Sequence, residues 1–194
     1  MNDWEQLYQE GDVGWDKGAP SPGLVDWLAE HGERERRRNK VIVPGCGFGH
    51  DVRAWAGAGF DALGLDLAPA AVEGAETRTP DTLPNATFRL GDFLEDEPFD
   101  TFDFVFEHTF FCAIAPSRRE DYVAACLRWL KPRGQLLAIH YMLPKDEEGP
   151  PHGTDHEEIT NLFRPHFQLL HERVPRSYPN RTGLERLFLR RKKT

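Results

Sequence analysis

The chain has 194 residues, of which 39% are hydrophobic, so it is long enough for one globular domain and short for two. Its formal net charge is −8, from 32 acidic and 24 basic residues, which disfavours a non-specific grip on nucleic acid or on an anionic membrane. No apolar stretch approaches the roughly 20 residues of a membrane span, and the first residues lack the pattern of a secretory signal. We therefore expect one cytoplasmic domain over residues 1–194.

The elements are predicted in chain order, beginning with the first 20 residues. This segment is rich in Trp, Tyr, Gly and Asp, and we expect a lid with little regular structure of its own. Ser21 and Pro22 then open a predicted helix that ends near His31.

Short β-rich runs alternate with helical patterns from residue 40 to about residue 109, which is typical of βαβ units and a parallel sheet. The predicted strands are 40–43, 62–65, 87–90 and 102–106, and the predicted helices between them are 51–58 and 69–77.

The second half predicts one more parallel strand and a closing hairpin. A helix is expected over 118–130, with Ser117 as its N-cap and Pro132 to Gly134 as its stop, before a strand over 135–141. After a loop over 144–153, Thr154 to Glu157 is interpreted as a capping box for a helix that ends near Phe163. The runs 167–174 and 184–189 fit two antiparallel strands.

The glycine-rich run after the first strand carries most of the functional information. Gly45, Gly47 and Gly49 can bring the backbone close to a ligand, and Asp66 lies 21 positions after Gly45, at the end of the next strand. A carboxylate there can accept hydrogen bonds from both hydroxyls of a ribose, so the pattern predicts an adenosine-cofactor site. The alternative is a glycine turn that merely links a strand to a helix, and the register of Asp66 weighs against it.

The glycine spacing bears on which cofactor is bound. Nicotinamide enzymes use G-x-G-x-x-G, whereas this chain has G-x-G-x-G. The segment Val43 to Asp51 resembles motif I of class I methyltransferases that use S-adenosylmethionine (SAM).

Five further segments resemble one branch of those enzymes, the thiopurine methyltransferase superfamily, and especially its thiol and halide methyltransferases. These segments are Trp4 to Pro20, Gly91 to Leu94, Phe102 to Phe106, Thr109 to Arg119, and Gly149-Pro150-Pro151.

The resemblance implies an α/β, Rossmann-like three-layer sandwich with a mostly parallel seven-stranded sheet and an antiparallel C-terminal strand. It also implies SAM as cofactor, S-adenosylhomocysteine (SAH) as product, and a small-molecule acceptor such as a thiol, bisulfide or halide. We expect no nucleic-acid or membrane partner, and a monomer or a weak homodimer.

The resemblance also assigns roles to residues. Trp4, Tyr8 and Trp15 would close over the sulfonium, where each aromatic face contributes about 0.5–2 kcal/mol; the alternative is a hydrophobic plug. Asp92 would accept from the adenine amino group beside Phe93, unless it is only a turn former. The candidate cofactor-binding residues are Trp4, Tyr8, Trp15, Gly45, Cys46, Gly47, Asp66, Leu67, Asp92, Phe93 and His108.

The candidate catalytic residues are His108 and Tyr141. Transfer of a methyl group to a soft anion is an in-line displacement that needs proximity and a dry approach, but no obligatory base. Oxygen or amine acceptors would need a base, for which His108, Glu107, His140 and Tyr141 are placed. Cys46, Cys112 and Cys126 have no metal-ligand spacing, so we expect small buried residues and no metal site.

Several alternatives stay open at this point. They are a thiopurine or another S-, N- or O-acceptor, a nicotinamide-dependent dehydrogenase, a nucleic-acid methyltransferase, and a SAM-binding module without turnover. Tyr8, His108, Met142 and His152 depart from the pattern of the family, so the sequence determines the cofactor better than the acceptor.

Overall fold

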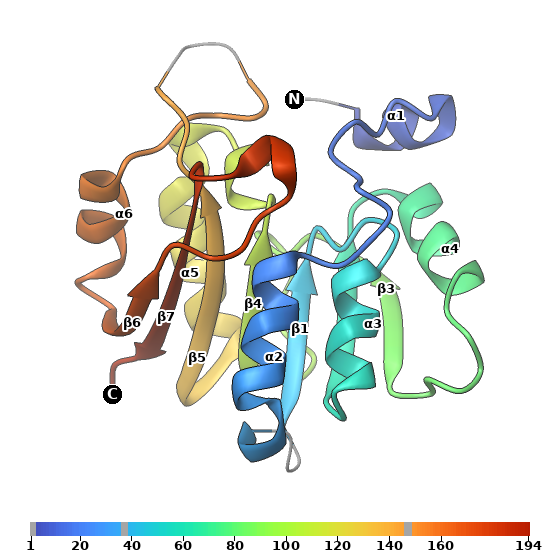
Figure 1. Ribbon diagram of the computed structural model, residues 1–194, viewed down its shortest axis with the longest axis horizontal. Coiled ribbons are helices and arrows are strands. Elements are labelled where there is room, and N and C mark those ends of the chain that lie inside the picture. The colour runs from blue at the N-terminus through green and yellow to red at the C-terminus, as the bar shows by residue number, and fades with distance from the viewer. Residues whose placement is uncertain (1–2, 36–38, 146–148) are drawn as a thin grey trace. The chain divides into compact units, whose positions relative to one another are not determined.

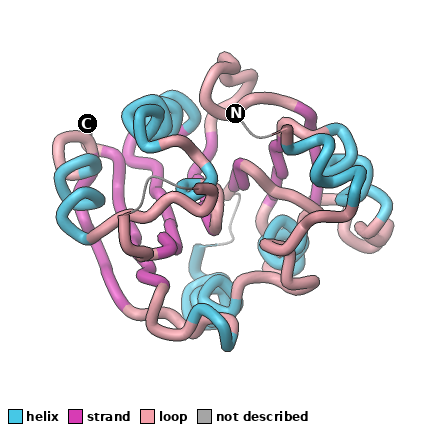
Figure 2. The backbone as a smooth tube through the Cα atoms, turned by 90° about the horizontal axis from the view of Figure 1, so that it is seen from above, coloured by secondary structure: helices cyan, strands magenta, loops and turns pink. Residues whose placement is uncertain are grey.

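The computed structural model describes residues 3–35, 39–145 and 149–194 (Figure 1), so residues 1 and 2 of the predicted lid and residues 146–148 of the predicted loop lie outside the described residues. The chain forms two compact units, Met1–Asp96 and Glu97–Thr194. Helices and strands alternate along both, as the cyan and magenta segments of Figure 2 show.

The first unit contains three parallel strands in the order β3-β2-β1. Val41, Ile42 and Val43 are all buried, which is what a parallel strand covered on both faces requires. The elements are α1 (Trp4–Glu10), α2 (Pro22–Glu35), β1 (Lys40–Pro44), α3 (His50–Gly57), β2 (Asp61–Asp66), α4 (Pro69–Thr77) and β3 (Ala86–Leu90).

The lid contains a helix, so the expectation of little regular structure is wrong. Asp3 is the N-cap of α1 and its carboxylate accepts a hydrogen bond from Gln6 N at 3.0 Å, while Gly11 ends the helix in the left-handed conformation. These two caps supply the partners that a seven-residue helix lacks internally. Helix α2 also continues beyond His31 to Glu35.

The second unit contains four strands in the order β4-β5-β7-β6, in which β4 and β5 are parallel and β7 is antiparallel to both of its neighbours. The predicted class, a mostly parallel seven-stranded α/β fold with an antiparallel C-terminal strand, is confirmed. The elements are β4 (Phe102–His108), η1 (Phe111–Ala113), η2 (Pro116–Arg118), α5 (Arg119–Trp129), β5 (Leu130–Tyr141), α6 (His156–Phe163), β6 (Phe167–Arg173), η3 (Pro179–Arg181) and β7 (Glu185–Lys192).

Helix α5 agrees with its predicted range to within one residue at each end, but the residues predicted to cap and stop it are wrong. Ser117 lies inside the short turn η2, so Arg118 takes the N-cap position without a side-chain hydrogen bond. At the other end, Leu130 already pairs with Phe102 of β4, so α5 passes directly into β5 and the Pro132–Gly134 segment lies within that strand.

The N-cap of α6 is displaced by one residue from the predicted capping box. Asp155, rather than Thr154, caps the helix, because its carboxylate accepts from Glu158 N at 2.8 Å. The Thr154 hydroxyl instead donates to the Glu158 carboxylate at 3.1 Å.

Candidate functional site

The glycine turn after β1 has the backbone geometry that its sequence predicts. Gly45, Gly47 and Gly49 have φ values of 58°, 51° and 76°, a region that residues with a Cβ rarely adopt. Cys46 N donates to Leu65 O at 3.2 Å, which ties the turn to the end of β2. A Cβ on Gly47 would lie 2.9 Å from the Tyr8 hydroxyl oxygen, so the turn leaves room there for a residue of the lid.

Asp66 is the last residue of β2 and is only 7% exposed. One carboxylate oxygen accepts from Gly47 N at 2.8 Å, and the other accepts from Ala68 N at 3.0 Å. Burial raises the pKa of Asp66, although these amide hydrogen bonds oppose the shift. A carboxylate has about four acceptor positions, so Asp66 keeps acceptor capacity for a ribose.

The end of β3 offers polar and apolar groups that fit an adenine ring. One oxygen of Asp92 accepts from Leu94 N at 2.8 Å, so the turn-forming role is real. Its other oxygen accepts no hydrogen bond within residues 3–35, 39–145 and 149–194. Phe93 is buried, but Leu67 and Leu90 are 46% and 51% exposed.

Leu90 was not among the residues predicted from the sequence. It pairs with Asp66 in the β2–β3 register, so it lies at the same strand ends as Leu67. A single leucine at the end of a strand carries no sequence signal for binding, and only its exposure distinguishes it. Acids at the ends of β2 and β3, together with two exposed apolar side chains, fit the ribose and adenine parts of SAM.

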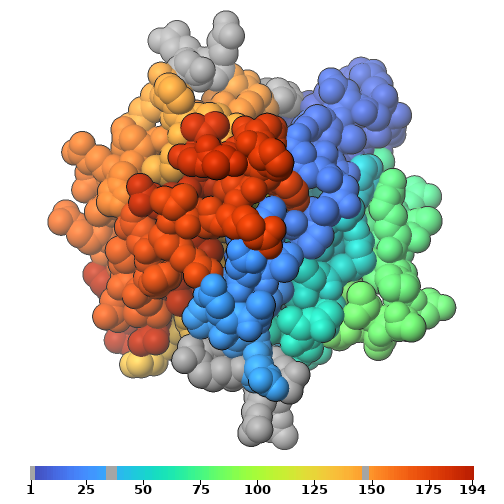
Figure 3. Space-filling view, in the orientation of Figure 1, coloured from blue at the N-terminus to red at the C-terminus, as the bar shows by residue number. Residues whose placement is uncertain are grey.

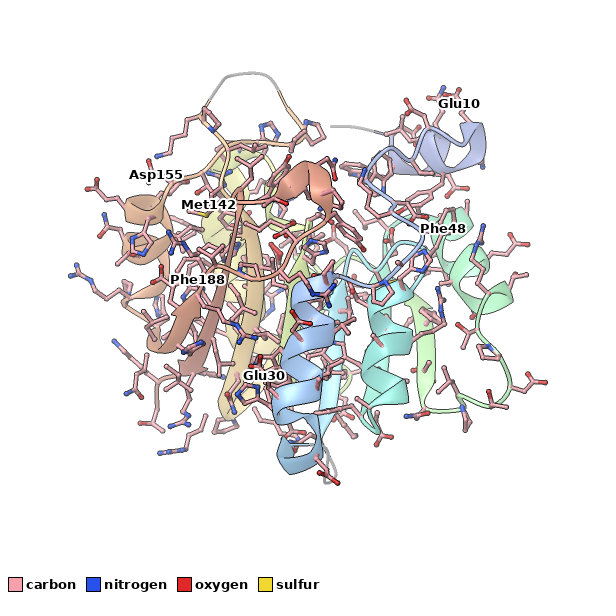
Figure 4. All side chains as sticks on the ribbon, viewed as in Figure 1. Glu10, Glu30, Phe48, Met142, Asp155 and Phe188 are labelled. Atoms are coloured by element: carbon pink, nitrogen blue, oxygen red, sulfur yellow. The ribbon has the colours of Figure 1, made fainter. Side chains whose placement is uncertain are left out.

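The three aromatic residues of the lid lie together. The Trp15 ring is 5.4 Å from that of Trp4 and 5.6 Å from that of Tyr8, both edge-on, and Trp15 Nε1 donates to the Tyr8 hydroxyl at 3.3 Å. Tyr8 also packs edge-on against Phe48 of the glycine turn at 5.2 Å. Figure 4 labels Phe48 below α1 and Glu10 at the far end of that helix. Burial and the nearby Asp66 carboxylate raise the pKa of Tyr8.

Glu5 and Asp16 make polar contacts between the lid and the rest of the first unit, and the sequence predicted neither contact. A carboxylate oxygen of Glu5 accepts from Ala70 N in the first turn of α4 at 2.9 Å, where the N-cap residue Ala68 offers no side-chain acceptor. Asp16 lies 3.2 Å from His50 Nε2 at the start of α3. Figure 3 shows the side chains of α1, in dark blue, at the visible surface.

His108 and Tyr141, the candidate catalytic residues, end β4 and β5. His108 Nε2 lies 2.9 Å from a carboxylate oxygen of Glu185, the first residue of β7. Arg181 Nη1 lies 3.5 Å from the same oxygen, and its guanidinium carbon lies 5.1 Å above the Tyr141 ring. Burial favours the neutral form of Glu185, but His108 and Arg181 outweigh it, so the pKa of Glu185 is lowered. Sequence reasoning missed Glu185 and Arg181, whose partner His108 is far away along the chain.

Glu107 and His140, the other residues considered as a base, lie in the core. Their side chains are 1% and 0% exposed, and the closest oxygen and nitrogen are 3.3 Å apart. The rings of Phe111, Phe163 and Phe188 surround His140 at 4.9 Å, 5.7 Å and 5.6 Å. Burial lowers the pKa of His140. The Glu107–His140 pair is therefore a structural element of the core.

The free cysteines and the acidic side chains indicate no metal centre in the described part of the chain. There, no group of three or more His, Cys, Asp and Glu side chains is arranged to hold a metal ion. Cys112 and Cys126 are buried as expected, whereas Cys46 is half-buried in the glycine turn. No helix within the described residues is long and apolar enough to cross a membrane.

The family model of thiopurine S-methyltransferase matches residues 1–180. A probable thiol methyltransferase 2 of Arabidopsis thaliana is 36% identical over 84% of this chain and 71% of its own length. Thiocyanate methyltransferase 1 of Brassica oleracea is 33% identical, over 95% of this chain and 82% of that protein. A thiopurine S-methyltransferase of Vibrio parahaemolyticus is 27% identical, over 82% and 80% of the two chains.

Solved structures share the fold. The 1,6-didemethyltoxoflavin-N1-methyltransferase of Burkholderia thailandensis, solved with S-adenosylhomocysteine, has a TM-score of 0.73 at 20% identity over 99% of this chain and 86% of that one. A TehB-like SAM-dependent methyltransferase of Corynebacterium glutamicum has a TM-score of 0.66 at 22% identity, over 98% and 94%. The family match over most of the chain, together with this fold, shows that the protein belongs to the thiopurine S-methyltransferase family and is a SAM-dependent methyltransferase.

Proposed function

We propose that this enzyme methylates a small, soft, anionic nucleophile, with a thiol or bisulfide sulfur as the first acceptor and a halide such as iodide as the second. The relatives named as thiol, thiocyanate and thiopurine methyltransferases support a sulfur acceptor. The observation that carries the proposal is the state of the candidate bases. Glu107 and His140 are core residues, and His108 is 7% exposed and directed at Glu185.

The chemistry asks little of the protein beyond binding and orientation. SAM supplies a methyl group on a sulfonium: the lone pair of the acceptor forms a bond to the methyl carbon while the carbon–sulfur electron pair stays on the sulfur of SAH. No proton leaves an anionic acceptor, so no side chain has to remove one. The protein contributes proximity, alignment and exclusion of water.

For the cofactor we propose that Asp66 accepts from the ribose hydroxyls and that the free oxygen of Asp92 accepts from the adenine amino group. Leu67 and Leu90 would flank the ring, with the buried Phe93 behind it. The backbone of Gly45, Cys46 and Gly47 would lie along the methionine part of SAM. Trp4, Tyr8 and Trp15 would cover it, and His108 and Tyr141 would contact the acceptor or the transferred methyl group. The positive φ values of the turn and the contact of Tyr8 with Gly47 support these roles.

A labelled-methyl screen tests the acceptor class. The purified chain is incubated with SAM carrying a labelled methyl group and with hydrosulfide, small thiols, iodide, thiopurines, amines and carboxylates in turn. We expect transfer to sulfur first and to iodide second. SAM binding without transfer to any of these would instead indicate a binding module without turnover.

The pH profile tests the absence of a base. For a thiol, kcat/KM should rise with the thiolate fraction and level off near the pKa of that thiol, about 8.5 for an unperturbed one. For iodide the same rise should be absent. An amine acceptor whose turnover is abolished by His108→Phe would show instead that His108 is a base. The halide activity, the cytoplasmic location and the monomeric or weakly dimeric state stay predictions.

A further inference from the structure

Arg181 is a buried arginine whose hydrogen-bonding capacity is mostly unused. It ends the short turn η3, it is 5% exposed, and its backbone N donates to Tyr178 O at 2.8 Å. A guanidinium has five N–H donors. Here Nη1 alone has polar neighbours, and Nε and Nη2 donate to none of the residues that the structure describes.

The Glu185 carboxylate satisfies the donors of Arg181 only in part. The distance from Arg181 Nη1 to the Glu185 oxygen is 3.5 Å, longer than the 2.7–3.2 Å of an ordinary N–H···O hydrogen bond. His108 Nε2 lies closer to that oxygen, at 2.9 Å. Glu185 therefore contacts both His108 and Arg181, and its negative charge is shared between them.

The rings of Tyr141 and Tyr178 also lie close to Arg181. The guanidinium carbon lies 5.1 Å from the centre of the Tyr141 ring and 5.8 Å from that of Tyr178. Guanidinium is weakly hydrated and stacks on aromatic faces. A guanidinium close to two aromatic rings favours a large, polarisable, weakly hydrated anion over a strongly hydrated one.

The strands bring this group to one edge of the second unit. His108 and Tyr141 lie at the carboxyl ends of the parallel strands β4 and β5, and Glu185 begins the antiparallel strand β7. The register joins Tyr141 directly to Glu185. Ligands of open α/β sheets bind outside the carboxyl ends of the parallel strands, and the contacts of Arg181 with His108 and Tyr141 place its guanidinium there.

We propose that Arg181 binds the anionic acceptor, donating Nε–H or Nη2–H to it while Glu185 fixes the orientation of the guanidinium. This inference rests on the proposed function, because it identifies the side chain that recognises the negative charge of the acceptor. The guanidinium takes no proton and forms no covalent bond. Methylation converts the anion into an uncharged product, so Arg181 attracts the acceptor and not the product of the transfer.

The test replaces Arg181 with glutamine and uses iodide, which is anionic at every pH. We expect KM for iodide to rise about 10- to 100-fold through the loss of a charge-assisted contact, with kcat changed less than about threefold. Calorimetry on the complex with SAH should show iodide binding in the wild type and none in Arg181→Gln. The affinity for SAH and the melting temperature should stay unchanged.

Arg186→Gln is the matched control, because it removes the same charge from the same region of the chain. Arg186 lies in β7, its side chain is 40% exposed, and it pairs with Glu172 at 3.6 Å. We expect no change in iodide binding or in KM for this variant. Arg181→Lys keeps the charge but loses the planar fork, so its KM should lie between those of the wild type and Arg181→Gln.

Different outcomes separate this inference from the proposed function. Suppose that the wild type methylates sulfur or iodide. If Arg181→Gln then keeps the KM of the wild type, Arg181 does not bind the acceptor. If Arg181→Gln loses SAH affinity and stability along with kcat, the role of Arg181 is structural. If Arg181→Gln does not fold, the KM of Arg181→Lys and inhibition by perchlorate test the inference instead. Perchlorate, a weakly hydrated anion that is not methylated, should compete with iodide but not with SAM, and absence of that competition overturns the inference. If no sulfur or halide acceptor is methylated while iodide binding still depends on Arg181, the proposed function fails and the anion site stands.

Discussion

Asp66 has two tasks, because its carboxylate joins the glycine turn to β2 through Gly47 N and also reaches the start of α4 through Ala68 N. The acid that we propose as the ribose acceptor is therefore already held in place by the backbone. Preorganisation of this kind lowers the cost of binding, since the side chain loses no further rotamer freedom.

Replacing Asp66 with alanine should weaken SAM binding by about 2–4 kcal/mol, because the ribose hydroxyls lose their acceptors and the turn loses its anchor. Calorimetry with SAM and SAH measures the effect. Asp92→Ala is the comparison, and it should cost less because Asp92 is half-buried and has only one free oxygen. Unchanged SAM affinity in Asp66→Ala would remove Asp66 from the site.

The pKa of Asp66 predicts an acid limit on cofactor binding. Burial raises this pKa above its ordinary value of 3.8, so the folded state favours the neutral form of Asp66 more than the unfolded state does. The contribution of the neutral form to the free energy of unfolding is lost as the pH rises through the raised pKa. Binding has the opposite sign, because only the carboxylate accepts from both hydroxyls. SAM affinity should therefore fall as the pH is lowered through the raised pKa. Asp66→Asn should remove that dependence in a calorimetric pH series.

Arg190 illustrates a buried charge with a stability cost. Its guanidinium carbon lies 4.5 Å from the centre of the Phe163 ring and 4.1 Å from that of Phe188, and burial lowers its pKa to about 10. Its Nη1 makes no hydrogen bond within the described residues. Replacing such a charge with an apolar side chain of similar length is often neutral or stabilising by about 1–4 kcal/mol. Chemical denaturation should find Arg190→Met at least as stable as the wild type, and a clear loss of stability would contradict this.

At the scale of elements, α1 docks through its first turn. Glu5 caps α4 across the chain, and negative side chains at a helix N-terminus contribute about 0.3–1 kcal/mol. Glu5→Ala should therefore loosen the lid, raise hydrogen exchange in α1 and weaken SAM binding by a few-fold. Glu10→Ala is the control on the same helix, because the Glu10 side chain accepts a hydrogen bond from Gln6 one turn earlier and from no other described residue. Equal effects of the two substitutions would show that the contact of Glu5 with Ala70 N does not specifically hold the lid.

Deleting residues 1 to 18 removes all but the last two residues of the lid. Since α1 has no buried residue, the rest of the fold should survive the deletion. SAM binding should weaken and turnover should stop, because water would reach the reacting groups. Circular dichroism checks the fold and the labelled-methyl assay checks turnover. Full activity in the truncated protein would exclude a lid that is required for catalysis.

The sequence predicted the strands and α4 well because their signals are local: apolar runs bounded by glycine, proline and acids. It missed the start of β5 at Leu130 and took Pro132–Gly134 as a helix stop, because Leu130 pairs with Phe102, a partner that no local pattern reveals. The same limit applies to the site. Asp66 follows from a motif, whereas the contact of His108 with Glu185 spans 77 positions and exists only in the fold.

At the scale of the whole molecule, the net charge of −8 opposes the approach of an anionic acceptor and favours the approach of SAM, whose net charge is positive. Screening weakens both effects. Adding sodium sulfate, whose anion is strongly hydrated, should therefore raise kcat/KM for iodide or a thiolate at saturating SAM and slow the association of SAM. Stopped-flow and steady-state measurements over a range of ionic strength check the two trends. If salt changed kcat/KM for the anion and the association rate of SAM in the same direction, charges near the site would matter more than the net charge.

The close approach of the Tyr8 hydroxyl to Gly47 has a consequence for how the sequence can change over evolutionary time. Any side chain at position 47 would meet that oxygen at 2.9 Å, but the next nearest atom, Tyr8 Cζ, would be 4.0 Å away. Substitution at 47 alone would wedge the lid off the turn, and would also strain a backbone with a φ of 51°. Once Tyr8 has become phenylalanine, only the backbone strain is left. The two positions are therefore expected to be inherited as a pair, with the change at residue 8 opening the path for the change at residue 47.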